Sequence, residues 1–229
     1  MTHSKFGLFV CTMVFSVMAF IPAAQAQQWT FAEREGGAKL VPFLEALLLF
    51  EADATWVMHT KIAGIAVLVS CTTIQAVNAK LKANGSIGSG AKVRFSGCIT
   101  QLNGMTSHAC EPNPGGIDPG VVTTNELHGL LKGELISILP DTGSTFSTLE
   151  MSEECPIGEK VPVFGTLTLK DGKGQLKSHL VKHLLEVGSK AEGTQLWTIS
   201  QTAEHETFIL GSRWAFLGGI HTGLKFSGE

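Results

Sequence analysis

The chain has 229 residues and a formal net charge of −3, and its 17 Lys and Arg form no basic stripe, which argues against a nucleic-acid-binding surface. Hydrophobic residues make up 44% of the chain, enough to bury a sizeable core, and Tyr is absent. The large amphipathic rings are therefore Trp29, Trp56, Trp197 and Trp214, and a buried anchor is a commoner role than a ligand platform for a Trp on a strand.

The first 26 residues have the three parts of a bacterial export signal. Lys5 supplies a positive start, Phe6 to Phe20 is almost entirely apolar, and Ala24-Gln25-Ala26 gives the small-x-small pattern of a signal peptidase site. The apolar run is shorter than the roughly 20 residues that span a bilayer. We therefore expect cleavage before Gln27, a secreted or periplasmic (cell-envelope) protein with one domain over residues 27–229, and no membrane span after cleavage.

Beyond the signal, short apolar runs alternate with Gly, Pro, Asn and Asp, which is typical of an all-β fold. Val41 to Phe50 fits either a helix or a buried strand, and Ile62 to Ser70 is predicted to be a strand. Asn84-Gly85 predicts a hairpin turn that leads into a strand ending at Cys98. Residues 111–120 are too rich in Pro and Gly for regular structure, so a loop is expected there.

The second half of the chain continues this pattern. Val161, Val163, Gly165, Leu167 and Leu169 alternate with wetter positions, which predicts a strand with one buried face. Leu176 to Val187 is an exception, because its apolar residues recur at helical spacing and favour a helix of about three turns. The predicted fold class is all-β, an antiparallel sandwich or barrel-like domain with this one short helix as an option.

Four cysteines follow the signal, namely Cys71, Cys98, Cys110 and Cys155. In an exported chain they allow three disulfide pairings. We predict Cys71–Cys98, which flank a hairpin-like segment, and Cys110–Cys155, which tie the Pro- and Gly-rich loop to a later strand. No Cys-x-x-Cys motif occurs, which disfavours zinc and a redox-active dithiol, and no cofactor is expected.

These features together resemble a set of uncharacterised secreted bacterial β-rich proteins. The shared elements are a strand that ends in Cys, a Gly-rich hairpin, a Phe-x-Gly-Cys strand, a third Cys, a Gly-x-(Val/Ile)-x-Thr segment, a Pro-x-x-Gly-x-x-Phe turn, a fourth Cys and a C-terminal segment. Here these elements are Ser70-Cys71, Asn84 to Gly90, Phe95-Ser96-Gly97-Cys98, Cys110, Gly120 to Thr124, Pro140 to Phe146, Cys155 and His221 to Gly228. The resemblance implies export and a β-domain, and it implies no particular activity.

Asp141-Thr142-Gly143-Ser144 matches the catalytic motif of aspartic proteases. One copy requires a homodimer, because that chemistry needs two carboxylates that share a proton. Pro140-Asp141-Thr142-Gly143 is also an ordinary turn sequence, and the turn is the favoured interpretation.

His179 and His183 are four residues apart, so on a helix they would share a face and form a candidate metal site. His205 and His221 are candidates for further ligands, but no His-Glu-x-x-His motif occurs. An exposed, solvated face is the favoured interpretation.

Two functional hypotheses follow from the sequence. The first is an exported β-domain with a non-enzymatic binding or structural role and no catalytic residues, whose ligand and partners the sequence does not identify. The alternative is an exported hydrolase, either a dimeric aspartic protease that uses Asp141 or a metal-dependent enzyme that uses His179 and His183.

Overall fold

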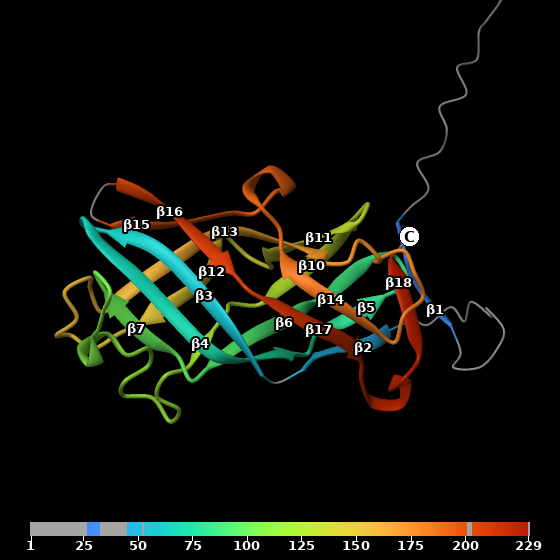
Figure 1. The fold of residues 1–229 in the computed structure, drawn as a ribbon, viewed down its shortest axis with the longest axis horizontal. Helices are drawn as coiled ribbons and strands as arrows, with labels where there is room; N and C mark the ends of the chain where they lie inside the picture. The colour runs from blue at the N-terminus through green and yellow to red at the C-terminus, as the bar shows by residue number, and fades with distance from the viewer. Residues whose placement is uncertain (1–26, 33–44, 52, 201–202, 229) are drawn as a thin grey trace, which may run out of the picture.

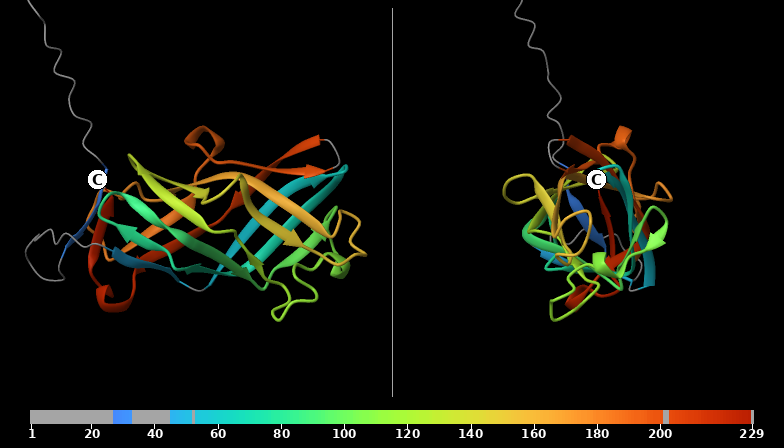
Figure 2. Two further views of the ribbon diagram at one scale, coloured as in Figure 1. Left: turned by 180° about the vertical axis from the view of Figure 1, so that it is seen from behind. Right: turned by 90° about the vertical axis from the view of Figure 1, so that its left-hand side faces the viewer.

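The computed structural model describes residues 27–32, 45–51, 53–200 and 203–228, so the predicted export signal lies outside the described residues. The described chain is all-β, as predicted, and antiparallel strands form an elongated barrel-like body (Figure 1). Seen along its long axis, the strands surround a common interior (Figure 2).

Two long strands run through both halves of the body, β6 (Ser86–Ser96) and β13 (Lys160–Asp171). The half at the right of Figure 1, called the cap half, is a closed ring in the order β11-β10-β6-β5-β2-β17-β14-β13 and back to β11. Its other strands are β2 (Glu45–Phe50), β5 (Lys80–Lys82), β10 (Leu127–Lys132), β11 (Leu135–Pro140), β14 (Lys182–Val187) and β17 (Ser212–Leu217).

The opposite half, called the disulfide half, is also closed, in the order β13-β15-β16-β3-β4-β6-β9, with a bridge between Thr124 and Ser147 that leads through β12 back to β13. Strands β7 and β8 extend the sheet beside β4. The strands are β3 (Asp53–Ile62), β4 (Ile65–Val77), β7 (Ile99–Leu102), β8 (Met105–Thr106), β9 (Val122–Thr123), β12 (Thr145–Glu150), β15 (Gln195–Ser200) and β16 (Ala203–Leu210).

A two-stranded sheet closes the end of the cap half. Strand β1 (Trp29–Ala32) pairs antiparallel with β18 (Lys225–Gly228), so the two ends of the described chain meet there (Figure 1). Phe31 and Phe226 are almost completely buried, and Trp29 contacts Phe226 with ring centroids 6.2 Å apart. This sheet, called the cap, therefore belongs to the core.

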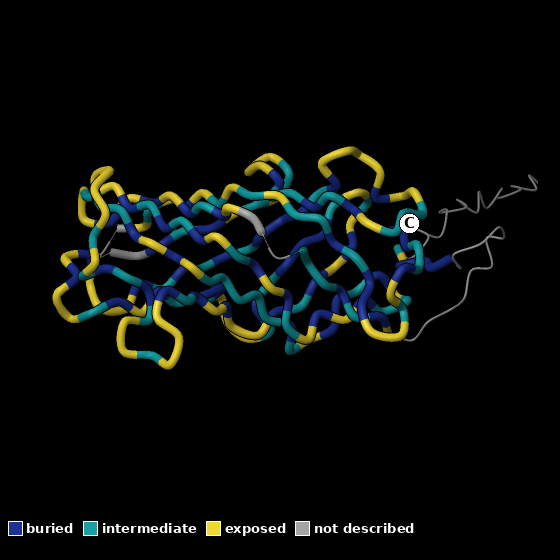
Figure 3. Tube along the Cα trace, turned by 60° about the horizontal axis from the view of Figure 1, so that its bottom comes forward, coloured by how far each residue is buried: buried dark blue, intermediate teal, exposed yellow. Residues whose placement is uncertain are grey.

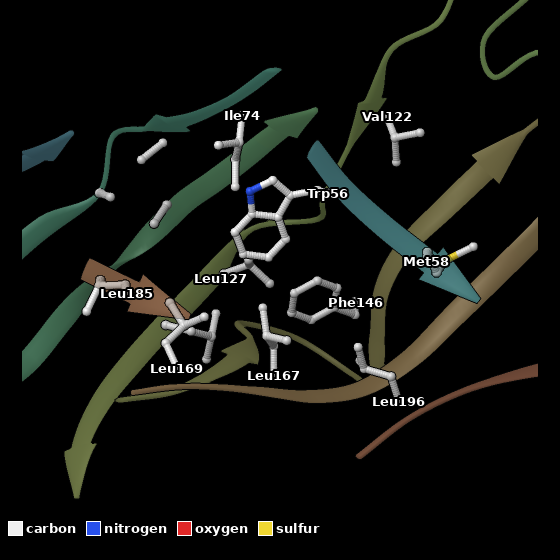
Figure 4. Packing of buried hydrophobic residues seen from close by; sticks show 14 of the residues in the cluster. Trp56, Met58, Ile74, Val122, Leu127, Phe146, Leu167, Leu169, Leu185 and Leu196 are labelled. Atoms are coloured by element: carbon white, nitrogen blue, oxygen red, sulfur yellow. The ribbon is translucent and has the colours of Figure 1, made fainter. Parts of the chain in front are cut away.

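The strands alternate between inward and outward residues, as β geometry requires. In β13, Val161, Val163, Gly165, Leu167 and Leu169 are all buried, which confirms the predicted buried face. Exposed residues gather in the loops and on the outer surface (Figure 3), and the apolar side chains pack inside (Figure 4).

Two of the predicted elements were wrong. The stretch Ile62–Ser70 is not one strand, because Ala63 and Gly64 adopt positive φ and form the two-residue turn between β3 and β4. The optional helix over Leu176–Val187 does not form. Residues 182–187 are strand β14, which pairs with β13 and β17, and this pairing outweighs the helical spacing of the leucines. Of the ambiguous stretch that starts at Val41, residues 45–50 are strand β2 and residues 41–44 lie outside the described residues.

Short 3₁₀ turns join some of the strands. They are η1 (His108–Cys110), η2 (Lys190–Glu192) and η3 (Gly219–His221).

Candidate functional site

The four cysteines form the two predicted disulfides. Cys71 in β4 is bonded to Cys98, which follows β6, and Cys110 in η1 is bonded to Cys155. All four are buried, and both bonds lie in the disulfide half. The cysteines are structural here, and disulfides of this kind are typical of proteins in oxidising compartments.

Asp141 lies in the turn between β11 and β12, and its carboxylate is held inside its own chain. One oxygen accepts a hydrogen bond from the Gly90 backbone N–H at 2.6 Å, and the other lies 3.0 Å from Nδ1 of His128. Its side chain is 13% exposed. Both oxygens are therefore used to fasten the turn to β6 and β10, which leaves neither free to share a proton with a second carboxylate.

His183 is fully buried in β14 and is hydrogen-bonded at both ring nitrogens. Nδ1 lies 2.7 Å from an oxygen of Asp171, and Nε2 lies 2.8 Å from the carbonyl oxygen of Phe226 in the cap. The second oxygen of Asp171 accepts the N–H groups of Lys173 and Gln175. Because a carbonyl oxygen only accepts, Nε2 donates to Phe226. Asp171 occupies Nδ1, so both ring nitrogens are engaged within the fold and neither is open to a metal.

His179 lies in the segment before β14 and belongs to a separate polar group. Its Nε2 is 3.0 Å from the hydroxyl oxygen of Thr30, which in turn lies 2.6 Å from that of Ser227. Ser227 is fully buried, so its hydroxyl does not face solvent as a nucleophile would. These contacts join β1 to β18 and to the segment beside them.

The sequence favoured an exposed, solvated helical face for His179 and His183, and this prediction was wrong: no helix forms, His183 is fully buried, and His179 is partly buried. The structure holds the two side chains in separate hydrogen-bonded groups beside the cap. In the described part of the chain, no group of three or more His, Cys, Asp or Glu side chains is arranged to hold a metal ion. The other candidate ligands, His205 in β16 and His221 in η3, lie on different elements.

The four tryptophans differ sharply in what covers them. Trp29 and Trp56 are buried in the core. Trp214 in β17 is partly buried, and the ammonium group of Lys173 lies over its ring, 4.8 Å from the centroid. Trp197 in β15 is also partly buried, and it lines an open groove on the outer surface.

The position of Trp197 follows from strand alternation. Its neighbours Leu196 and Thr198 are 2% and 0% exposed and point inward, so the indole points outward. A Cβ at Gly165 in β13 would lie 2.7 Å from Cζ3 of the indole, so the ring covers a position where only glycine fits. Phe164 stacks beside it, with ring centroids 6.1 Å apart and planes 22° apart. The backbone and Phe164 therefore fix the ring.

The groove beside Trp197 has a volume of about 350 Å³ and lies on the β15–β16 hairpin at the upper left of Figure 1. Besides Leu196 and Trp197, its walls are polar side chains. They are Lys190, Gln195, Glu204 and Glu206. Lys190 and Glu206 form an ion pair at 2.8 Å, and Glu206 is directly opposite Trp197 in the sheet register. The groove thus combines one aromatic ring with carboxylate, amide and ammonium groups.

Sequence reasoning missed this groove, although part of its signal was present. Gln195 and Trp197 alternate with buried residues, as do Glu204 and Glu206, which places each pair on one face of its strand. The register that sets Trp197 against Glu206 comes from the hairpin itself and was not predicted.

No family model matches the chain, and neither curated proteins nor solved structures show a significant similarity to it. Within the described ranges, no helix has the length and apolar character needed to cross a membrane.

Proposed function

We propose that this chain is an exported bacterial protein, secreted or held in the periplasm or cell envelope, whose role is non-enzymatic binding of a carbohydrate chain at Trp197. The export signal predicted over residues 1–26, the two disulfides and the resemblance to secreted bacterial β-rich proteins support the location. The observation that carries the binding role is the open groove that sets the Trp197 ring among polar side chains.

The chemistry of a sugar fits this combination of groups. A pyranose ring has an apolar face of C–H groups, which stacks on an aromatic face, and an edge of hydroxyl groups, which both donate and accept hydrogen bonds. Carboxylates accept such bonds, and an amide both donates and accepts them. Glu204 and Gln195 flank the ring and are exposed, so they are placed to bind the hydroxyl edge.

The contrast with Trp214 supports the same assignment. Both rings lie on outer strand faces and are partly buried, but a lysine ammonium covers the ring of Trp214. Among the described residues, no lysine or arginine lies over the ring of Trp197, and polar side chains line the groove beside it. In addition, the polar atoms of Asp141, His183 and Ser227 are engaged in hydrogen bonds that hold the fold together, which favours binding over hydrolysis.

The test is a titration of the ¹⁵N-labelled mature chain with soluble tetrasaccharides of three chemical classes: neutral, N-acetylated and anionic. We expect one class to shift the indole N–H resonance of Trp197 and to bind with a dissociation constant at or below about 1 mM, the weak end of specific recognition. Trp197→Ala should weaken that binding at least tenfold, whereas Trp214→Ala should leave it unchanged.

Because the Trp197 ring also packs over Gly165, Trp197→Ala changes packing as well as binding. A second variant that keeps the ring separates the two effects. Gln195→Ala keeps the ring and removes a hydroxyl partner, so it should weaken binding about threefold to tenfold, as the loss of one hydrogen bond does. If no class binds, or if Trp197→Ala and Trp214→Ala bind equally well, the assignment is wrong.

A further inference from the structure

The outer face of strand β16 continues past the groove at Trp197. Every second residue of this strand points away from the interior, as strand alternation requires. These residues are Glu204, Glu206, Phe208 and Leu210, and all four are exposed. The two glutamates line the groove, whereas Phe208 lies beyond its walls and is 53% exposed. A large aromatic ring therefore stands on the surface beside the proposed binding site, where β16 runs next to β15 and β3 (Figure 1).

The sheet register sets the position of Phe208 relative to Trp197. Trp197 in β15 lies directly opposite Glu206, and Phe208 follows Glu206 by two residues on the same face. The two aromatic residues are thus diagonal neighbours, and the Cα atoms of such residues in an antiparallel pair lie about 7–8 Å apart. Rings at this separation can each contact a unit of the same sugar chain.

Polar side chains border Phe208 as they border Trp197. His59 in β3 is directly opposite Phe208 and is exposed. On the other side, Gln195 takes the opposite position in β15, because its neighbour Leu196 pairs with Thr207. A neutral imidazole and an amide each carry a donor and an acceptor, as the hydroxyl groups of a sugar do. The Phe208 ring therefore has hydroxyl-binding groups on both sides, which is the combination found in the groove.

On the other side of Trp197, the neighbouring ring is already engaged. Phe164 in β13 stacks with the indole, with the two planes 22° apart, and is partly buried. Phe208 differs in this respect, because no ring or cation of the described residues contacts it. A bound chain thus gains a free aromatic face when it runs from β15 towards β3.

We propose that Phe208 forms a second subsite of the carbohydrate site, so that a chain bound at Trp197 crosses β16 towards His59. One sugar unit stacks on Trp197 and another on Phe208, while Gln195 and Glu206, which lie between the two rings, bind hydroxyl groups. This inference rests on the carbohydrate binding proposed for Trp197. It adds the direction of the chain and a preference for long chains over single sugars.

The test measures the affinity of the mature chain for tetrasaccharides and monosaccharides, by following the Trp197 indole N–H resonance. The probes are cellotetraose and glucose, chitotetraose and N-acetylglucosamine, and tetragalacturonate and galacturonate. In the class that binds, the tetrasaccharide should bind at least about tenfold tighter than the monosaccharide, which covers only one ring. Phe208→Ala should weaken tetrasaccharide binding about tenfold, as the loss of an aromatic anchor does.

Two further variants separate stacking from a general change of the surface. Phe208→Leu keeps an apolar side chain and removes the flat ring, so it should weaken tetrasaccharide binding as much as Phe208→Ala. Leu210→Ala is the matched control, because Leu210 is 59% exposed on the same face but two residues further from the groove. It should bind the tetrasaccharide as the wild type does.

The outcomes distinguish the second subsite from the carbohydrate site itself. If none of the tetrasaccharides binds, both proposals are wrong. If one binds, the second subsite alone is wrong when the monosaccharide binds equally well, when either Phe208 variant keeps the wild-type affinity, or when Leu210→Ala weakens binding as much. A second copy of the chain is the alternative occupant of this face. A wild-type dimer in sedimentation velocity that Phe208→Ala dissociates would also overturn the second subsite.

Discussion

The two ends of the body are closed by different physical means. The disulfide half is tied by covalent bonds, Cys71–Cys98 and Cys110–Cys155, across 27 and 45 residues of chain. The cap half is closed by β1 and β18, which come from opposite ends of the described chain and are held by a partly buried hydrogen bond to His179 and a buried one to His183. A disulfide acts largely by restricting the unfolded chain, whereas the cap depends on contacts that exist only in the native state.

This difference predicts that the ends respond differently to perturbation. The contacts of the cap join residues nearly 200 positions apart, so they close a very long loop and belong to the slowest part of the topology to form. The two disulfides constrain the disulfide half in both the folded and the unfolded chain. Local opening should therefore begin at the cap, and changes in the disulfide half should act on the molecule as a whole.

The largest effect is expected from removal of the Cys110–Cys155 bond. Replacing both cysteines with alanine should lower the free energy of unfolding by about 4 kcal/mol, from the entropy of the 45-residue loop that the bond closes. The same change at Cys71 and Cys98, with a 27-residue loop, should cost slightly less, about 3.5 kcal/mol. Urea unfolding of both variants checks this, and a loss below about 1 kcal/mol in either would contradict it.

The second-largest effect is expected at the cap, from loss of the buried His183–Asp171 pair. His183→Ala should lower the free energy of unfolding by about 3 kcal/mol, because it leaves the Asp171 carboxylate buried without its partner. Amide hydrogen exchange should accelerate first at Leu180, Phe226 and Gly228, whose N–H groups join the cap to the segment that precedes β14.

His128→Ala is the matched control for this variant. His128 also pairs with an aspartate in the cap half, Asp141, but its side chain is 36% exposed. The loss should therefore stay below about 1 kcal/mol. Equal effects of the two substitutions would show that burial of the His183 pair is not what holds the cap.

Much of the local structure was readable from the sequence. The alternation in β13 and the Asn84-Gly85 turn depend on residues that are close together in the sequence. The pairing of the cysteines depends on their order along the chain and on an oxidising compartment, where disulfides form. The pairing of β1 with β18, the closure of the two rings and the Trp197 groove depend on registers between distant segments, which no local pattern encodes.

Strand β14 shows why such a local pattern can mislead. Leu180, Leu184 and Val187 recur at helical spacing, but His183 and Leu185 alternate with more exposed neighbours and are the residues that the structure buries. The sequence contains both periods. Pairing with β13 and β17, together with the Asp171 and Phe226 partners of His183, selects the strand.

A smaller effect is expected from a pair of glycines that differ in their surroundings. Gly85 in the cap half and Gly64 in the disulfide half both have positive φ, at 79° and 85°. A Cβ at Gly85 would overlap the carbonyl oxygen of Gln27, whereas one at Gly64 meets nothing within 4 Å. Gly64→Ala should cost about 1 kcal/mol and Gly85→Ala about 2 kcal/mol, because only the second adds a clash to the backbone strain.

Thermal unfolding measures both glycine variants under identical conditions. If the two substitutions cost the same, then the segment before β1 moves away without penalty, and the cap does not extend to Gln27. A larger loss of stability for Gly85→Ala would show that Gln27 belongs to the part of the cap half that unfolds as one cooperative unit.

The smallest effect concerns the junction of the two halves, where η2 connects β14 to β15. The backbone N–H of Ser189, followed by the ammonium group of Lys170, lowers the pKa of Glu192 to about 2. An unfolded glutamate titrates near 4.3. Since the folded pKa is the lower one, the contribution to stability is complete above about pH 4.5 and is lost as the pH falls towards about 2.

Glu192→Gln should therefore reduce the loss of stability between pH 6 and pH 3, measured as the shift of the urea midpoint in each variant. The side chain is 29% exposed, so solvent screening keeps the change small. Glu134→Gln is the control, because Glu134 also faces a lysine, Lys177 at 3.9 Å, but is 55% exposed. An identical pH response in wild type and Glu192→Gln would mean that the junction adds nothing to the acid sensitivity of the protein, and that the responses of its two ends are independent of the turn between them.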